Sequence, residues 1–151
     1  MAEMDVSAVV EFCEELIGRM DLEVSVTATV NGEVLQVNLA GPDRAVLLAG
    51  GAAVLNAIEY LVNRVFRSGR DEKAEAIVLD SDKYRQHREA ELVLLAQMAS
   101  KTVLAQRKSL SLQPMSPKER RIVHLALSAI EGVRSESQGE GDARSITIFP
   151  S

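Results

Sequence analysis

The residues best suited to chemistry lie near the carboxyl end of the chain, where residues 120–124 read Arg-Arg-Ile-Val-His. Arg120 and His124 are four positions apart, so on a helix their side chains lie one above the other on the same side. A guanidinium and an imidazole that project together offer several N–H donors to a phosphate or a carboxylate. Lys118 and Arg121 add positive charge beside them. The spacing therefore predicts an anion-binding site.

A plainer interpretation of the same residues stays open. Arginine and histidine four apart on a helix are common, and Arg120 has carboxylates within reach of it in the sequence, at Glu119, Glu131 and Asp142. In that case Arg120 forms an internal ion pair and binds no ligand.

Strong local signals predict the elements that position these residues. Ser116 is expected to be a helix N-cap, Pro117 occupies the tolerated first position, and Glu119 is expected to close a capping box. The helix is predicted to run to about Glu131, with Gly132 as its C-cap. Short strands are predicted at 109–112, 133–137 and 145–149, the last two joined by a polar, glycine-rich loop.

A hairpin is the clearest signal in the first half of the chain. Alternating apolar residues flank Asn31-Gly32, a pair typical of a type I′ turn because both turn positions need positive φ. A two-residue loop at Asn31-Gly32 would place Ala28 opposite Leu35 and Val26 opposite Val37, with one face of the hairpin buried.

Further periodic segments surround this hairpin. The predicted order is helix, strand, strand, helix, helix, strand and a long helix that ends near Lys108, so the fold class is α+β. Asp5 or Ser7 is expected to cap the first helix, and Asp43 the short helix after the hairpin. Three of these helices are expected to bury one apolar face each. The apolar positions are, in the first helix, Val9, Val10, Cys13, Leu16, Ile17 and Met20; in the helix after Gly50-Gly51, Leu55, Ile58, Leu61, Val62 and Val65; and in the long helix, Leu92, Leu95, Ala99 and Val103.

Composition excludes several classes of protein. With 46% hydrophobic and 26% charged residues, the 151-residue chain has enough apolar content for a core. One cysteine and two histidines give no disulfide framework and no zinc finger. No nucleophile–base pair or phosphate-binding loop of the Walker type occurs, so neither an enzyme nor a cofactor is expected. The apolar runs look too short for a membrane span and the acidic start does not resemble a signal peptide, which favours the cytoplasm.

Charge divides the chain into two parts. Residues 1–80 hold 14 acidic and 6 basic side chains, a net charge of −8, whereas residues 81–151 hold 8 acidic and 11 basic, a net charge of +3. A polyanion is therefore expected to prefer the second part, because phosphate contacts come from lysine and arginine.

Two spaced motifs make the second part similar to a known family. Residues 116–124 read Ser-Pro-Lys-Glu-Arg-Arg-Ile-Val-His, and Ser137-Gln138-Gly139-Glu140 and Arg144 follow. This pattern resembles the Arg-xxx-His ("R-three-H") domain, most closely that of the bacterial Jag (SpoIIIJ-associated, KhpB) family. The resemblance implies single-stranded nucleic-acid binding, with Arg120 and His124 as the motif residues. Lys118, Arg121, Ser137 and Arg144 are the further candidate binding residues.

The same resemblance implies a type II KH domain before the R-three-H domain. The expected domains are then 1–80, KH-like; 81–107, a connecting helix; and 108–151, the R-three-H domain. The KH nucleic-acid loop is Gly-x-x-Gly with basic central residues, but the aligned tetrad here is Ala49-Gly50-Gly51-Ala52. It lacks both outer glycines and any charge, so a tight turn between two helices is favoured over an RNA-binding loop. Arg64, Arg67 and Arg70, spaced by three on the following helix, could supply some charge, but a solvated helix face explains them equally well.

Two functions follow as hypotheses. The first is a non-enzymatic protein that binds single-stranded nucleic acid, with RNA favoured over DNA, and that by family resemblance takes part in cell elongation or division. The alternative is a protein–protein interaction adaptor on a KH-like scaffold with weak or lost nucleic-acid affinity. The sequence leaves the RNA target, any protein partner and the oligomeric state open.

Overall fold

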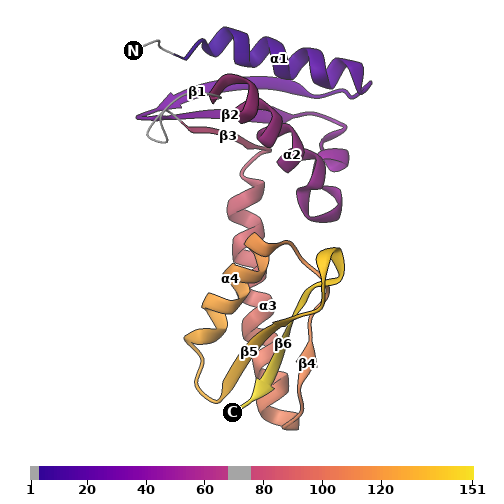
Figure 1. Ribbon diagram of the computed structural model, residues 1–151, viewed down its shortest axis with the longest axis vertical. Helices are drawn as coiled ribbons and strands as arrows, with labels where there is room; N and C mark the ends of the chain where they lie inside the picture. Colours follow the sequence, from indigo (N-terminus) through magenta and orange to yellow (C-terminus); the bar gives the residue numbers. More distant parts are fainter. Residues whose placement is uncertain (1–3, 68–75) are drawn as a thin grey trace. The chain divides into compact units, whose positions relative to one another are not determined.

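A computed structural model of the protein describes residues 4–67 and 76–151. The chain forms two compact units, Met1–Tyr84 and Arg85–Ser151, and its mixture of helices and small sheets confirms the α+β fold class (Figure 1). The elements in chain order are α1 Val6–Arg19, β1 Ser25–Asn31, β2 Val34–Ala40, α2 Arg44–Arg67, β3 Ala76–Asp80, α3 Tyr84–Gln106, β4 Leu110–Ser111, α4 Pro117–Ser128, β5 Val133–Gln138, the 3-10 turn η1 Gly141–Ala143, and β6 Ser145–Pro150.

Helix α1 begins as predicted. The Asp5 side chain accepts a hydrogen bond from the Ala8 N–H at 3.1 Å, which satisfies one of the free donors at the helix start. Val9, Cys13 and Ile17 are buried at the predicted spacing, whereas Met20, at the end of the expected stripe, is exposed. Helix α1 therefore packs on the first sheet through one narrow apolar face.

The hairpin forms, but the predicted register is wrong by two residues. The turn residues are Gly32 and Glu33, because Asn31 pairs with Val34 and Ala28 pairs with Val37. Gly32 has φ +61° and Glu33 has no positive φ, which suits a turn that needs glycine only at its first central position. A shift of two keeps the alternation in phase, so the face predicted to be buried is still the buried one.

Strand β3 completes a three-stranded sheet in the order β1-β2-β3, and it runs parallel to β2. One face of this sheet is buried by α1 and α2 together. The strand expected before the long helix covers residues 74–79 in the sequence pattern. Its first two residues lie outside the described residues, as does Arg70. The core of the first unit contains Leu35, Val37, Leu39, Leu55, Ile58, Val62, Ile77 and Leu79.

Helix α2 consists of two helices separated by a break at the predicted place. Gly50, Gly51 and Ala52 all have φ between +60° and +72°, and Ala49 is extended. Ala52 is buried in this left-handed conformation, which favours glycine. Two expectations here were wrong. The Asp43 carboxylate accepts from the Glu23 N–H at 2.6 Å instead of capping the helix, and Leu61 and Val65 are exposed.

By length and composition alone, α2 qualifies as a membrane span, with a mean hydropathy of 1.8. The expectation that every apolar run is too short to span a membrane is therefore not confirmed for α2. The break at Ala49–Ala52 divides the segment into helices that are each shorter than the roughly 20 residues needed to cross a bilayer. Leu47, Leu55, Ile58 and Val62 are also buried in the protein core. A helix that is buried in a protein core can have the same length and hydropathy as a membrane span.

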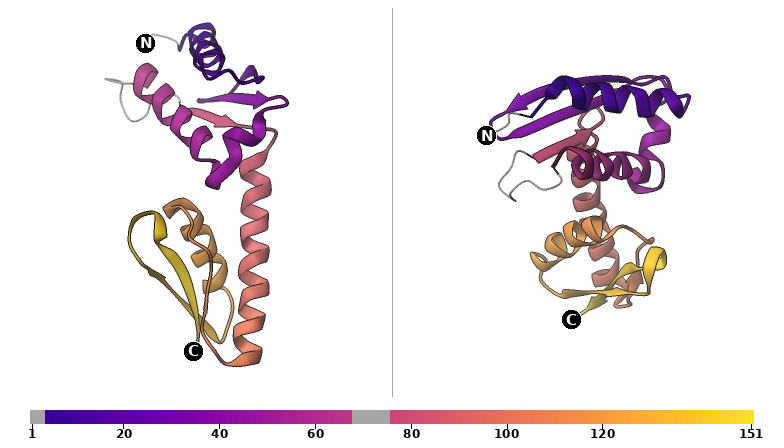
Figure 2. Two further views of the ribbon diagram at one scale, coloured as in Figure 1. Left: turned by 90° about the vertical axis from the view of Figure 1, so that its right-hand side faces the viewer. Right: turned by 45° about the horizontal axis from the view of Figure 1, so that its top comes forward.

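The second unit is a three-stranded antiparallel sheet in the order β4-β6-β5, with α3 and α4 on one side of it (Figure 2). Both helices contribute to one apolar cluster with β6, so α3 is part of this core as well as a connection along the chain. The predicted buried face of α3 is confirmed except at Leu95, which is exposed, while Ala96 takes a buried place. The cluster consists of Leu92, Ala96, Ala99, Val103, Val123, Leu127, Ile146 and Ile148.

Cys13 is a buried core residue, as its place in the sequence predicts. Burial raises the pKa of the Cys13 thiol from 9.0 to about 11, and the negative charge of Glu14 adds to the effect. We predict that the folded protein does not react with Ellman's reagent at pH 8 and reacts fully once it is denatured. Because the folded state holds the thiol proton more tightly, the stability that this thiol contributes is present below pH 9 and is lost as the pH rises towards 11.

Rapid labelling of the folded protein at pH 8 would contradict this prediction. A Cys13→Ala variant is the control for the alkaline range, because its loss of stability above pH 9 reports every group except this thiol.

Candidate functional site

Helix α4 begins at the predicted position. The Ser116 hydroxyl accepts from the Glu119 N–H at 3.3 Å, and Pro117 is the first helical residue. The Glu119 carboxylate does not close the capping box. It accepts instead from Arg88 Nε on α3 at 2.9 Å, and its side chain is only 12% exposed. A largely buried carboxylate needs a strong partner, and the arginine of the neighbouring helix supplies it.

The buried residues of α4 set the direction in which its other side chains project. Val123 and Leu127 are fully buried against α3 and β6. Arg120 is half-buried and His124 is exposed at the border of this apolar face. In the described part of the chain the Arg120 guanidinium makes no hydrogen bond and no ion pair. The alternative that it pairs with a nearby carboxylate is therefore not seen, and Glu119 is already bound to Arg88.

His124 is held by a residue that the sequence analysis missed. Its Nδ1 is 2.6 Å from the Ser135 hydroxyl on β5, which orients the ring and leaves Nε2 as the nitrogen available to a ligand. Ser135 and Ser137 are two apart on one strand, so both side chains are on the face that carries α4. This alternation was a signal that could have added Ser135 to the candidate residues.

Arg120 lies along the same strand. Helix α4 and β5 run in opposite directions, since a short turn joins them. Four residues of helix rise about 6 Å and two residues of strand about 6.7 Å. With His124 beside Ser135, Arg120 is therefore level with Ser137. Strand β5 is at the edge of the sheet, so this row of polar side chains follows an open edge.

The predicted site residues Ser137 and Arg144 contact each other. Arg144 donates from Nε to the Ser137 hydroxyl at 2.7 Å and from its two terminal nitrogens to the carbonyl oxygens of Gly139 and Ser137, at 3.0 and 3.3 Å. Three of its five N–H donors thus hold the turn between β5 and β6. Gly139 has φ +94°, and a Cβ there would come within 3.1 Å of the Ala143 oxygen, so this turn favours glycine.

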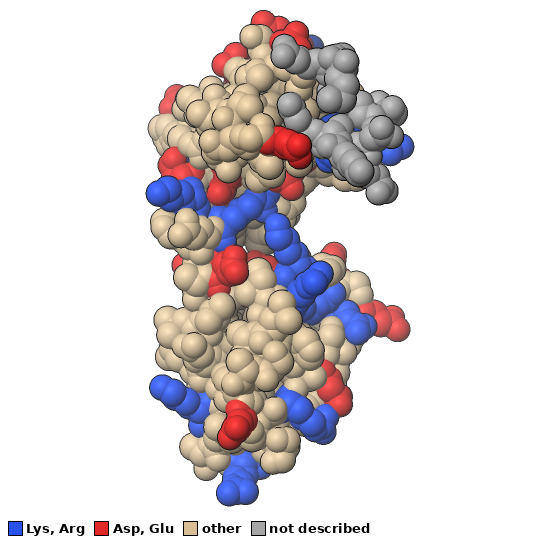
Figure 3. Space-filling view, turned by 90° about the vertical axis from the view of Figure 1, so that its left-hand side faces the viewer, with Lys and Arg blue, Asp and Glu red and all other residues tan. Residues whose placement is uncertain are grey.

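The two remaining basic candidates, Lys118 and Arg121, are exposed on α4 and make no ion pair among the described residues. Residues 81–151 have a net charge of +3, so this part of the chain is mildly basic. Figure 3 shows, on one face of the molecule, several groups of Lys and Arg side chains together with acidic side chains and uncharged surface. Such a surface suits a ligand that contacts a few phosphates.

The tetrad Ala49-Gly50-Gly51-Ala52 belongs to the first unit, and the structure does not bring it together with the α4 residues in one unit. Its left-handed residues form a tight turn between the two halves of α2, as the sequence favours. The Asn56 side chain donates to the Gly51 carbonyl oxygen at 3.4 Å. The tetrad itself contributes no charged side chain.

Most of the second unit matches a known domain family. Residues 90–150, which cover α3 from Ala90 onward, α4 and the second sheet, match the R-three-H domain family. The matched segment starts inside α3, in keeping with the place of this helix in the core of the second unit.

Over most of its length the chain is also similar to several bacterial proteins named RNA-binding protein KhpB. The one from Clostridium symbiosum is 32% identical over 141 residues, which cover 92% of this chain and 63% of the relative. The one from Bacillus subtilis is 29% identical over 137 residues, covering 89% and 64%, and that from Streptococcus pneumoniae is 24% identical over 97% of this chain and 44% of the relative. The chain spans less than two thirds of the length of these relatives. The resemblance to the Jag, or KhpB, family is thus confirmed.

We predict that the Arg88–Glu119 contact stabilises the second unit. Glu119→Gln replaces the largely buried carboxylate that accepts from Arg88 Nε by a neutral amide, so it is expected to lower the free energy of unfolding by about 1–3 kcal/mol. Glu131→Gln, at an exposed position, is the matched control and should change it by less than about 0.5 kcal/mol. Urea denaturation followed by circular dichroism measures both. Equal stability of the two variants would show that the contact contributes nothing.

Proposed function

We propose that this protein binds single-stranded RNA through α4 and β5 of its second unit. The observation that carries the proposal is the Arg120 guanidinium, which has no partner among the described residues and is one helical turn from a histidine held in place by Ser135. An unpaired guanidinium beside an oriented imidazole has the donors that a sugar–phosphate backbone accepts. The names of the KhpB relatives and the R-three-H match support RNA as the ligand.

Each candidate residue has a distinct role in this proposal. Arg120, with Lys118 and Arg121 beside it, binds phosphates, and His124 contacts the strand through Nε2. Ser135 positions the His124 ring. Arg144 and Ser137 act through the shape of the β5–β6 turn, since most of the Arg144 donors are already used there. Binding alone accounts for this arrangement, so the proposed protein is not an enzyme.

The first unit is proposed to be a KH-like domain of type II. Its element order, with a helix, a hairpin, two helices separated by a turn, and a strand, agrees with that assignment. The domains proposed are 1–80, 81–107 and 108–151, with the connecting helix contributing to the second core. A protein of this kind acts where RNA is present, which makes the cytoplasm its proposed location.

We predict that Arg120→Ala weakens the binding of a single-stranded RNA oligonucleotide about 10- to 100-fold, because a charge-assisted contact to phosphate is worth about 1.5–3 kcal/mol. The matched control is Arg134→Ala. It removes the same charge from the second unit, but the Arg134 guanidinium is already paired with Glu136 and lies 4.3 Å from the centre of the Phe149 ring. Fluorescence anisotropy measures both affinities, and the affinity of the control should change by less than about threefold.

The salt dependence of the same affinity tests the kind of contact. Three or four phosphates at about 0.7 each predict a slope of about −2 to −3 for the logarithm of the association constant against that of the salt concentration. Arg120→Ala should make the slope shallower by nearly one phosphate. A slope of zero, or equal binding by Arg120→Ala and the wild type, would contradict phosphate recognition by this site.

Crosslinking locates the bound strand on the chain. Ultraviolet crosslinking of a bound oligonucleotide, followed by identification of the modified peptides, is expected to mark residues 116–124 and 135–144. The uncharged turn at 49–52 is expected to carry few crosslinks, because its unit has a net charge near −8 that repels a polyanion. Crosslinks confined to residues 44–52 would overturn the proposed site and assign binding to the turn in α2.

A further inference from the structure

Helix α3 exposes a row of residues on the side away from the core of its unit. The positions alternate four and three apart, as in a coiled coil, and every one of them is exposed. Leu94 is 55% exposed and Met98 is 61% exposed, at the middle of the row. The buried face of the helix, which includes Leu92 and Ala96, is directed to the other side. The row consists of His87, Glu91, Leu94, Met98, Lys101 and Ala105.

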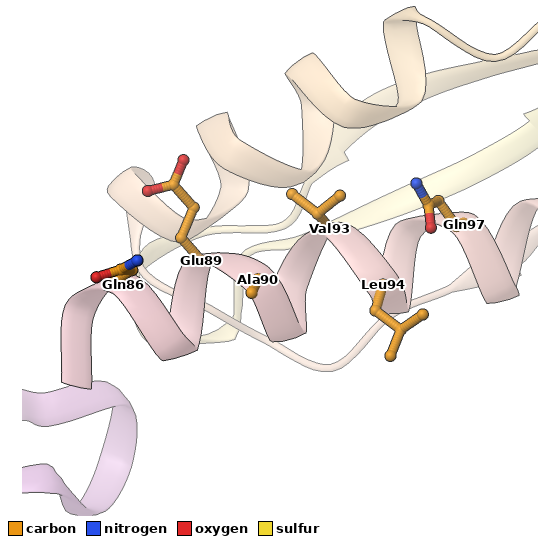
Figure 4. Close-up of a pocket in the computed structure, with 6 residues that line it drawn as sticks. All are labelled: Gln86, Glu89, Ala90, Val93, Leu94 and Gln97. Carbon is orange, nitrogen blue, oxygen red and sulfur yellow. The ribbon is translucent and has the colours of Figure 1, made fainter. Parts of the chain in front are cut away.

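Beside this row is a hollow of about 470 Å³, and the described residues that line it all belong to α3 (Figure 4). Figure 4 shows Val93 directed towards α4 and Leu94 directed to the opposite side. Because these lining residues come from one helix, they form the floor of the hollow, and no other part of residues 4–67 and 76–151 faces them across it. The lining residues are Gln86, Glu89, Ala90, Val93, Leu94 and Gln97.

We propose that a second copy of this chain covers the row, with the two α3 helices packed antiparallel about a twofold axis. In this arrangement Leu94 of each copy faces Met98 of the other, so the four exposed apolar side chains form the centre of the contact. Glu91 then faces Lys101 of the second copy, and the twofold axis produces this pair twice. Leu104, which is also exposed, faces the small Ala90 of the other copy and fills the hollow there.

The charges of the row select this partner and this direction. An in-register parallel pair would place Glu91 against Glu91 and Lys101 against Lys101, which is unfavourable at both ends. The antiparallel pair turns both contacts into ion pairs. The charges of this row are complementary to those of an identical row that runs in the opposite direction, so the row fits a second copy of the same helix. Arg88 contacts Glu91 at 3.3 Å in the same helix, and a carboxylate with two oxygens can accept from both cations.

A charge-exchange experiment tests the proposal on the full chain. Sedimentation equilibrium of the wild type over a wide concentration series is expected to show a mass that rises from 16.4 kDa towards twice that value. Glu91→Lys and Lys101→Glu each replace two ion pairs by two like-charge contacts, and each is expected to weaken dimerisation at least about tenfold. The double variant restores opposite charges in exchanged places and is expected to dimerise within about threefold of the wild type.

Glu11→Lys on α1 is the control for the charge change alone and should dimerise as the wild type does. Met98→Glu, which places a charge at the apolar centre, should abolish the dimer, and circular dichroism shows whether each variant is folded. A wild type that is monomeric throughout the series overturns the proposal, as does a dimer that neither single charge reversal weakens. Because α4 is on the other side of α3, the affinity of Met98→Glu for a short RNA should stay close to that of the wild type, so this result is independent of the proposed RNA site.

Discussion

The burial of Val123 and Leu127 against α3 and β6 is the constraint on which the rest of the second unit depends. It fixes the rotation of α4 about its axis, and the rotation decides that Arg120 and His124 project along the open edge strand β5. The Arg88–Glu119 contact adds to this constraint at the start of the helix. The packed core places both motif residues on one side of α4, and Ser135 holds the His124 ring before any ligand arrives, which lowers the entropy cost of binding.

The sequence predicted those features that depend on neighbours along the chain. The Ser116-Pro117 start of α4 and the interruption at 49–52 are decided by hydrogen bonds and φ angles within a few residues, and both are found. The pairing of Glu119 with Arg88 depends on a residue 31 positions away, so local rules assigned its carboxylate to the capping box instead. The hairpin was predicted only in part. The turn was correctly located at Gly32, but hairpin turns can place glycine at either the first or the second central position. The two choices differ by two residues in the register of the strands.

The candidate site shows the same division. The i, i+4 spacing of Arg120 and His124 was enough to place them on one side of a helix. Their proximity to β5 required the tertiary fold, which is why Ser135 was missed although its neighbour Ser137 was named. Similarly, Leu95 and Ala96 differ by one position on α3, and only the packing against β6 decides which of the two is buried. A periodic pattern fixes the apolar face of a helix to within about one residue.

Because the second unit carries only a mild positive charge, the proposed dimer would bind long single strands more tightly than a monomer does. A site that engages a few phosphates binds weakly, and the acidic first unit contributes no attraction for a polyanion. Two such sites in one dimer convert the second contact with a long strand into an intramolecular event at high effective concentration. The gain requires a strand long enough to reach both sites and is absent for a short oligonucleotide. A preference for long single strands would therefore arise from helix pairing alone, without any additional contact between the protein and the bases.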